Sequence, residues 1–226
     1  MLPQEVPQLP GYEIAVFMRT ATEVGGDYYD FVPGDGEVLN VGFGDATGHG
    51  MQAGTIVTLM KGLFLSEAAR SGIQAFFHHC SATIKGIRLG RLFMAFSLVR
   101  IKGSTVAFSC AGMPPIFLYR RSAGSVEEMQ LRGMPLGAMK NAPYGLQEVA
   151  MEPGDTLLLL TDGLPEQKNA SGEMFDYARV RSTLEASCPS SPQAIIDSLV
   201  KAGEGWMDGV PLDDDITLLV IQRKAS

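Results

Sequence analysis

Residues 153–163 have the sequence Pro-Gly-Asp-Thr-Leu-Leu-Leu-Leu-Thr-Asp-Gly. Turn-forming residues, Pro153-Gly154-Asp155 before it and Asp162-Gly163 after it, bound an uninterrupted run of leucines. A short apolar run between turn signals predicts a β-strand that is buried on both faces. We therefore predict a strand over 156–161, lying inside a layered fold and ending at an aspartate.

On either side of this strand, the sequence predicts groups of strands that alternate with pairs of helices. Turn sequences at 33–36, 102–104 and 122–124 join neighbouring strands as hairpins, so the sheets should be mostly antiparallel. The segments between these groups of strands have apolar residues at helical spacing, which predicts helices there. The pattern predicts an α/β layered sandwich of two mostly antiparallel β-sheets flanked by α-helices. The predicted strands are 12–19, 28–32, 38–43, 92–101, 105–110, 116–120, 126–131 and 216–222, and the predicted helices are 51–69, 73–85, 174–186 and 193–202.

Length and composition limit the kinds of protein to which this chain can belong. The 226 residues suit one domain over 11–226, after an extended lead-in over 1–10 that has three prolines and resembles the end of an interdomain linker. A net charge of -7 without a run of Lys or Arg argues against nucleic-acid binding. No apolar run approaches the roughly 18 residues of a membrane span, so we expect no membrane contact by this domain. Three widely spaced cysteines predict thiols in a reducing compartment, the cytoplasm.

Aspartates occur repeatedly at the ends of predicted strands. They are Asp27, Asp45, Asp162 and the run Asp213-Asp214-Asp215. If the strand ends converge, these like charges repel one another unless divalent cations with oxygen ligands neutralise them. The alternative is that Asp-Gly pairs simply form turns, which we expect for Asp35-Gly36 and Asp208-Gly209. The acids therefore indicate a metal site without naming a reaction.

Several segments together resemble one known family. They are EVGGDYYDF (23–31), GDATGHG (44–50), AGMPP (111–115), GMPLG (133–137), PGD (153–155), TDG (161–163), GEMF (172–175) and DDITLL (214–219). Their order and spacing resemble the PPM (type 2C-like) metal-dependent protein serine/threonine phosphatases, in the bacterial SpoIIE/RsbU branch. The resemblance covers nearly the whole chain.

The resemblance implies a hydrolase with two Mn²⁺ or Mg²⁺ ions. Asp45 matches the carboxylate that bridges both ions, and Ala46 would offer its backbone carbonyl. Asp162 and Asp214 match the acids on one ion, and Asp27 matches an acid near the other. We prefer Asp214 to its two neighbours because it heads the DDITLL segment. Metal-activated hydroxide would then attack the phosphorus of a phosphoserine or phosphothreonine.

The resemblance also implies partners. The substrate would be a phosphorylated regulatory protein, a STAS-type anti-sigma factor antagonist, and an upstream sensor domain would control the activity. The alternative is a weakly active or silent module of the same fold that only binds its partner. The sequence does not decide whether the chain forms a homodimer or which residue is the general acid. His49 is a candidate for the acid, although a histidine at such a place more often caps a turn or fills space.

Overall fold

Hydrogen bonding sorts the strands into two sheets that belong to different parts of the chain. The computed structural model describes residues 2–3, 5–48, 50–88, 90 and 92–225. The chain divides into two units, each assembled from separate segments. The first unit contains Met1–Leu9, Thr22–Met113 and Gln130–Ala150, and the second contains Pro10–Ala21, Pro114–Met129 and Met151–Ser226.

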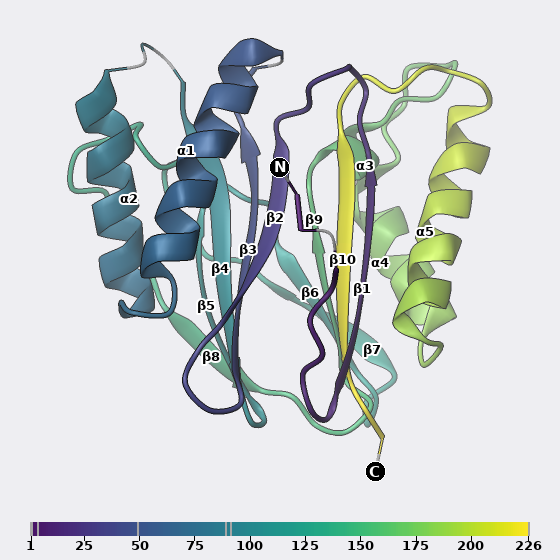
Figure 1. Cartoon of the computed structure of the whole chain (residues 1–226). Coiled ribbons are helices and arrows are strands. Elements are labelled where there is room, and N and C mark those ends of the chain that lie inside the picture. Colours follow the sequence, from purple (N-terminus) through teal and green to yellow (C-terminus); the bar gives the residue numbers. More distant parts are fainter. Residues whose placement is uncertain (1, 4, 49, 89, 91, 226) are drawn as a thin grey trace. The chain divides into compact units, whose positions relative to one another are not determined.

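The first unit is a five-stranded antiparallel sheet with two helices on one face (Figure 1). The strand order is β2-β3-β4-β5-β8. Phe64, Phe76 and Phe77 from the helices pack with Phe96 of the sheet, and these four side chains are fully buried. This aromatic cluster holds the helices on the sheet. The elements are β2 (Asp27–Pro33), β3 (Val38–Ala46), α1 (Met51–Glu67), α2 (Ile73–Ile87), β4 (Met94–Lys102), β5 (Thr105–Ala111) and β8 (Gln147–Ala150).

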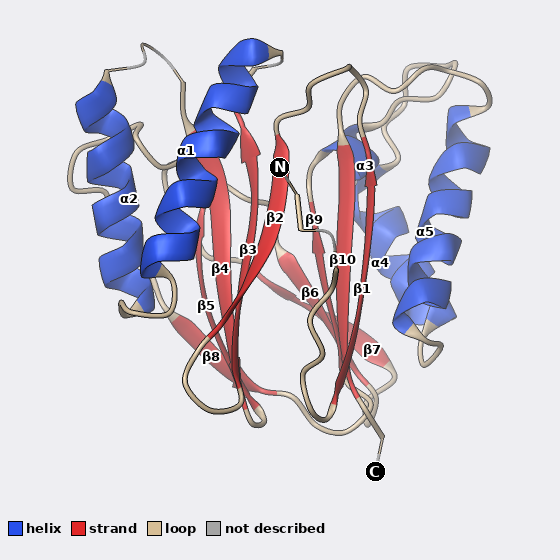
Figure 2. Cartoon of the chain, viewed as in Figure 1, coloured by secondary structure: helices blue, strands red, loops and turns tan. Residues whose placement is uncertain are grey.

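The second unit is also a five-stranded antiparallel sheet with helices (Figure 2). The strand order is β1-β10-β9-β6-β7. Every residue of β9 is buried, which confirms the prediction from the leucine run. Leu158 and Leu160 face the core that the helices complete. The elements are β1 (Tyr12–Arg19), β6 (Ile116–Arg120), β7 (Ser125–Met129), β9 (Thr156–Leu160), α3 (Gly163–Glu166), α4 (Asp176–Ser187), α5 (Pro192–Met207) and β10 (Ile216–Arg223).

The predicted fold class of two antiparallel sheets flanked by helices is confirmed. Strand β8 and helix α3, of four residues each, were not predicted from the sequence. Strand β8 exists through its pairing with β5, some 40 positions earlier in the chain, and α3 is a single turn that contains a proline. Neither leaves a periodic signal in the sequence. Among the described residues, no helix has the length and apolar character that a bilayer crossing requires.

Candidate metal centre

Two of the predicted site residues face each other in the sheet of the first unit. Asp27 is the first residue of β2, and its direct partner in the antiparallel ladder is Asp45 of β3. Cross-strand partners point to the same face with their Cβ atoms about 4.5–5.5 Å apart. Asp27 is only 4% exposed, and Asp45 is partly exposed. The ladder therefore brings two acids together, and it extends β3 past its predicted end at residue 43 to include Asp45.

The backbone at Gly26 packs closely against a carbonyl oxygen and one carboxylate of this pair. Ala46 donates its N–H to the carbonyl of Gly26 over 3.0 Å. A Cβ at Gly26 would lie 2.7 Å from the Ala46 carbonyl oxygen and 2.9 Å from Asp45 Oδ1. Any side chain larger than that of glycine would press on these two oxygens, a carbonyl and a carboxylate oxygen that lie close together here. These are the ligand types that Mg²⁺ and Mn²⁺ prefer, so the residues present fit a hard divalent cation.

The other two predicted acids belong to the second unit. Asp162 follows β9 and precedes α3, and its carbonyl accepts the N–H of Glu166 over 2.8 Å. Thr161 donates its N–H to the Thr217 carbonyl over 3.1 Å, and Thr217 donates its N–H to Thr161 Oγ1 over 2.9 Å. These two bonds tie the end of β9 to the start of β10, which begins at Ile216, two positions after Asp214.

The electrostatics of Asp162 show that Asp214 lies nearby. Burial is the largest cause that raises the pKa of the Asp162 carboxyl, and the charges of Glu166 and Asp214 raise the same pKa further. Burial and neighbouring negative charge both disfavour the ionised carboxyl, and a bound cation reverses both effects. The second unit therefore supplies a second pair of acids suited to a cation.

The three consecutive aspartates have different environments. Asp215 is 5% exposed, and its Oδ1 accepts the N–H of Ala21 over 2.8 Å, which ties down the chain after β1. The Asp213 side chain is 63% exposed and lies 3.9 Å from Lys168 Nζ. Asp214 is exposed and accepts the N–H of Asp215 over 2.8 Å. The charge of Asp214 raises the pKa of Asp162, which supports its choice as a ligand.

The acids occur as pairs. In the part of the chain that the structure describes, no group of three or more His, Cys, Asp or Glu side chains could hold a metal ion. Backbone carbonyls, such as that of Ala46, and water would have to complete the coordination of each cation. His49, the candidate general acid, lies outside the described residues.

Sequence reasoning missed an ion pair that connects the strand of Asp27 to α1. Lys61 Nζ of α1 lies 2.5 Å from Asp30 Oδ2, and the Tyr28 hydroxyl donates to the same oxygen over 3.1 Å. Asp30 is 4% exposed, and it stands three positions after Asp27 on β2. The pair therefore fixes α1 against the strand that carries a predicted ligand. A lysine isolated on an otherwise nearly uncharged helix was the available signal.

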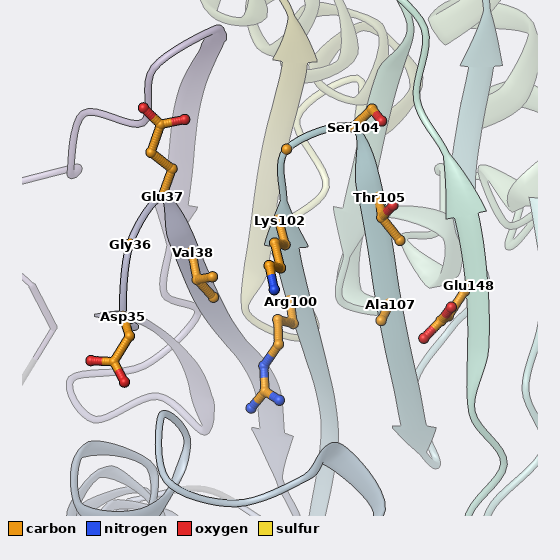
Figure 3. A pocket seen from close by; sticks show the side chains of 11 residues that line it. Asp35, Gly36, Glu37, Val38, Arg100, Lys102, Ser104, Thr105, Ala107 and Glu148 are labelled. Atoms are coloured by element: carbon orange, nitrogen blue, oxygen red, sulfur yellow. The ribbon is translucent and has the colours of Figure 1, made fainter.

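A large pocket of the first unit lies away from these acids. Its volume is about 750 Å³, and it is lined by the β2–β3 and β4–β5 turns and by Glu148 of β8 (Figure 3). Val38, at its edge, begins β3, whereas Asp45 lies near the other end of that strand. Arg100 in its wall donates to Asn40 Oδ1 and to the carbonyls of Ala68 and Ser71 over 2.6–2.9 Å. Arg100 therefore joins the α1–α2 turn to the sheet, and none of the predicted metal ligands lines this pocket.

Comparison with known protein families gives one match that covers most of the chain. The family model described as Stage II sporulation protein E (SpoIIE) matches residues 35–224. Protein IcfG of Synechocystis sp. is 26% identical over 253 residues, which cover 98% of this chain and 39% of IcfG. Phosphoserine phosphatase RsbU of Bacillus subtilis is 25% identical over 237 residues, which cover 99% of this chain and 67% of RsbU. The chain thus spans about two fifths of one relative and two thirds of the other.

Solved structures share the fold over almost the whole chain. The RsbU and RsbW domains of Rv1364c from Mycobacterium tuberculosis match with a TM-score of 0.80 at 25% identity, over 97% of this chain and 62% of that one. The SiaA-PP2C domain of Pseudomonas aeruginosa matches with a TM-score of 0.81 at 21% identity, over 92% and 85%. RsbX in complex with magnesium matches with a TM-score of 0.75 at 18% identity, over 96% and 98%. The last two likenesses concern the fold alone.

Proposed function

Since the chain belongs to the SpoIIE family, we propose that it is a metal-dependent protein phosphatase that hydrolyses phosphoserine or phosphothreonine on a regulatory protein. The observation that carries the proposal is the direct opposition of Asp27 and Asp45, with the Ala46 carbonyl and Asp45 Oδ1 both packed closely against Gly26. In this proposal residues 11–226 form the catalytic domain, and residues 1–10 lead into it from an interdomain linker. The name of the relative RsbU, phosphoserine phosphatase, supports the reaction class.

The proposed ligands are the two acid pairs and one carbonyl. Asp27, Asp45 and the Ala46 carbonyl would supply the oxygen ligands of the first unit. Asp162 and Asp214 would supply those of the second unit. Two bound Mn²⁺ or Mg²⁺ ions supply Lewis-acid stabilisation of phosphate charge and lower the pKa of water. Gly26 lets the Asp45 carboxylate approach the backbone closely, and Asp162 would hold a cation in its ionised form, after losing any proton that its raised pKa retains.

No cysteine of the described chain is suited to act as the nucleophile. Burial raises the pKa of the Cys80 thiol to about 12, and burial raises those of Cys110 and Cys188 to about 11. The thiolate is the nucleophilic form of cysteine, so these thiols are inert near neutral pH. All three cysteines are free, which agrees with the proposed location in the reducing cytoplasm. Water is therefore the proposed nucleophile.

The partner side of the proposal comes from the family. We infer that the substrate is a STAS-type regulatory protein phosphorylated on serine, and that a sensor domain upstream controls the phosphatase. The length of the relatives supports this inference, because IcfG and RsbU both contain sequence beyond the part that matches this chain.

The deciding experiment measures phosphate release by the purified chain. The substrate is a STAS-type protein phosphorylated on serine, and the assay is run with Mn²⁺, with Mg²⁺ and with a chelator. We expect turnover that requires a divalent cation and that falls at least about a hundredfold in Asp45→Asn and Asp214→Asn, since each change removes ligand charge. Asp213→Asn is the matched control and should keep full activity. Absence of turnover with either ion, including when the upstream domains are attached, would instead favour the silent partner-binding module.

A further inference from the structure

A pocket with a basic lining lies on α2, away from the acid pairs. Residues of α2 from His78 onward, Arg88 at its end and the loop residues 140–142 line a volume of about 350 Å³, in the range of small-ligand pockets. Four basic side chains line it, together with the polar groups of Ser81 and Asn141. Among the described residues, no Asp or Glu is part of the lining. The basic side chains are His78, Lys85, Arg88 and Lys140.

The charge of this pocket is opposite to that of the chain. The net charge is -7, yet residues 68–126 contain no Asp or Glu at all, and neither do residues 129–147. Both walls of the pocket come from these two acid-free stretches. A local cluster of positive charge attracts anions, whereas the acidic remainder of the surface repels them. The charge pattern therefore favours an anion as the occupant.

The two walls are held together before any ligand binds. Gly137 donates its N–H to Ser81 Oγ over 3.1 Å, and Lys85 Nζ donates to the Ala138 carbonyl over 3.0 Å. The ring of His78 packs edge-on against Tyr144, with 5.4 Å between the ring centroids. A pocket with fixed walls loses less conformational entropy when it binds a ligand.

Two lining residues have left-handed backbone, which is uncommon for arginine and tolerated by asparagine. Arg88, which ends α2, has φ 58°, and Asn141 has φ 59°. The left-handed position at the end of a helix usually holds glycine, because a Cβ is disfavoured there. Strained backbone concentrates at functional sites. Arginine at this position therefore costs backbone energy and presents a guanidinium to the pocket.

We propose that this pocket is a binding site for a compact phosphate compound, with Arg88 and Lys140 as its main charged contacts. The guanidinium of Arg88 suits two phosphate oxygens at once, and Lys140 adds a point charge from the opposite wall. Ser81 and Asn141 offer neutral polar groups at the same surface. The site shares no residue with the proposed metal ligands, so it does not depend on the proposed catalytic function.

The test is calorimetric titration of the full chain with inorganic pyrophosphate, after a chelator has removed divalent cations. We expect saturable binding at one site that weakens as salt is added, because screening reduces the attraction. The double variant Arg88→Gly, Lys140→Ala should bind at least about tenfold more weakly, which corresponds to the loss of charge-assisted hydrogen bonds. Lys201→Ala, an exposed lysine of α5, is the matched control and should bind as the unmodified chain does.

The variant at Arg88 separates loss of binding from loss of folding. Glycine relieves the left-handed strain, so Arg88→Gly should unfold at the same or a higher Tm while binding pyrophosphate more weakly. Equal affinity in the double variant, or the absence of saturable binding at millimolar pyrophosphate, would overturn the proposal. So would loss of binding in Asp45→Asn, which would place the anion at the metal site. A phosphoserine peptide that binds this pocket more tightly than pyrophosphate would overturn the assignment to small phosphate compounds.

Discussion

Asp27 lies directly opposite Asp45 in the β2–β3 ladder, so two carboxylates share one face of the sheet, and Asp45 Oδ1 and the Ala46 carbonyl oxygen both lie beside Gly26. Like charges that face each other across a ladder destabilise the pairing. The arrangement is favourable when a cation lies between the oxygens. This opposition gives the first unit a local reason to bind a divalent ion, and it leads to the first prediction.

Replacing Asp45 with asparagine should separate metal binding from folding. Without divalent cations, Asp45→Asn should be at least as stable as the unmodified chain, because one of two opposed charges is gone. With Mn²⁺ present, the unmodified chain should gain Tm through ligand binding, and the variant should gain much less. Scanning calorimetry with and without Mn²⁺ measures both effects. An equal Mn²⁺-dependent rise of Tm in the variant would remove Asp45 from the metal site.

A methyl group at Gly26 should damage the same site sterically. The Cβ of Gly26→Ala would press on the Ala46 carbonyl and the Asp45 carboxylate, so we expect at least about a tenfold loss of Mn²⁺ affinity and a cost of about 1–3 kcal/mol in stability. Gly62→Ala in α1 is the control, because no atom lies within 4 Å of its added Cβ. That change should raise stability by about 0.5–1 kcal/mol. Similar behaviour of the two variants in metal titration and urea unfolding would contradict the proposed role of Gly26.

The stability contributed by Asp162 should depend on pH with a definite sign. Its pKa is raised above the ordinary value of 3.8 by burial, by Glu166 and by Asp214, so the folded state retains the proton to higher pH than the unfolded chain. In metal-free protein this group therefore favours folding at low pH, and that contribution is lost as the pH rises through the folded-state pKa. Asp162→Asn should raise the free energy of unfolding more at pH 7 than at pH 4. Urea unfolding at the two pH values measures this difference. A larger gain in the free energy of unfolding at pH 4 than at pH 7 would contradict the raised pKa of Asp162.

The three consecutive aspartates should give three different phenotypes. Asp215→Ala removes the buried acceptor of the Ala21 N–H and should cost about 1–3 kcal/mol of stability. Asp214→Asn should keep the fold and abolish metal-dependent phosphate release. Asp213→Asn should change neither quantity, since its 3.9 Å contact with Lys168 is exposed. Paired measurements of unfolding and turnover test this division, and loss of turnover in Asp213→Asn alone would reverse it.

Breaking the Lys61–Asp30 pair should loosen α1 from the sheet. Lys61→Met leaves the Asp30 carboxylate buried without its cation, and we expect a loss of about 2–4 kcal/mol. The double variant Asp30→Asn, Lys61→Met should recover part of that loss, because no charge is then left buried. Urea unfolding of both variants provides the measurement. A single variant as stable as the unmodified chain would show that the pair does not hold the helix.

Much of this protein follows from local sequence. The leucine run of β9 and the hairpin turns predicted two antiparallel sheets, because a strand or turn depends on neighbours within a few positions. The ordered motifs predicted the family, and the SpoIIE match over 35–224 confirms it. Strand β8 was not predicted, because its stability comes from pairing with a strand that is distant in the sequence.

The sequence by itself determined which residues carry oxygen ligands and which segments are strands, since both are properties of residue type and local pattern. Only the tertiary structure decided that Asp27 faces Asp45, that Asp215 is buried as the acceptor of the Ala21 N–H, and that basic residues from α2, from its C-cap and from the loop at Lys140 line one pocket. Each of these relations joins positions far apart in the chain. Their register is set by long-range hydrogen bonds and core packing, which no short stretch of sequence encodes alone.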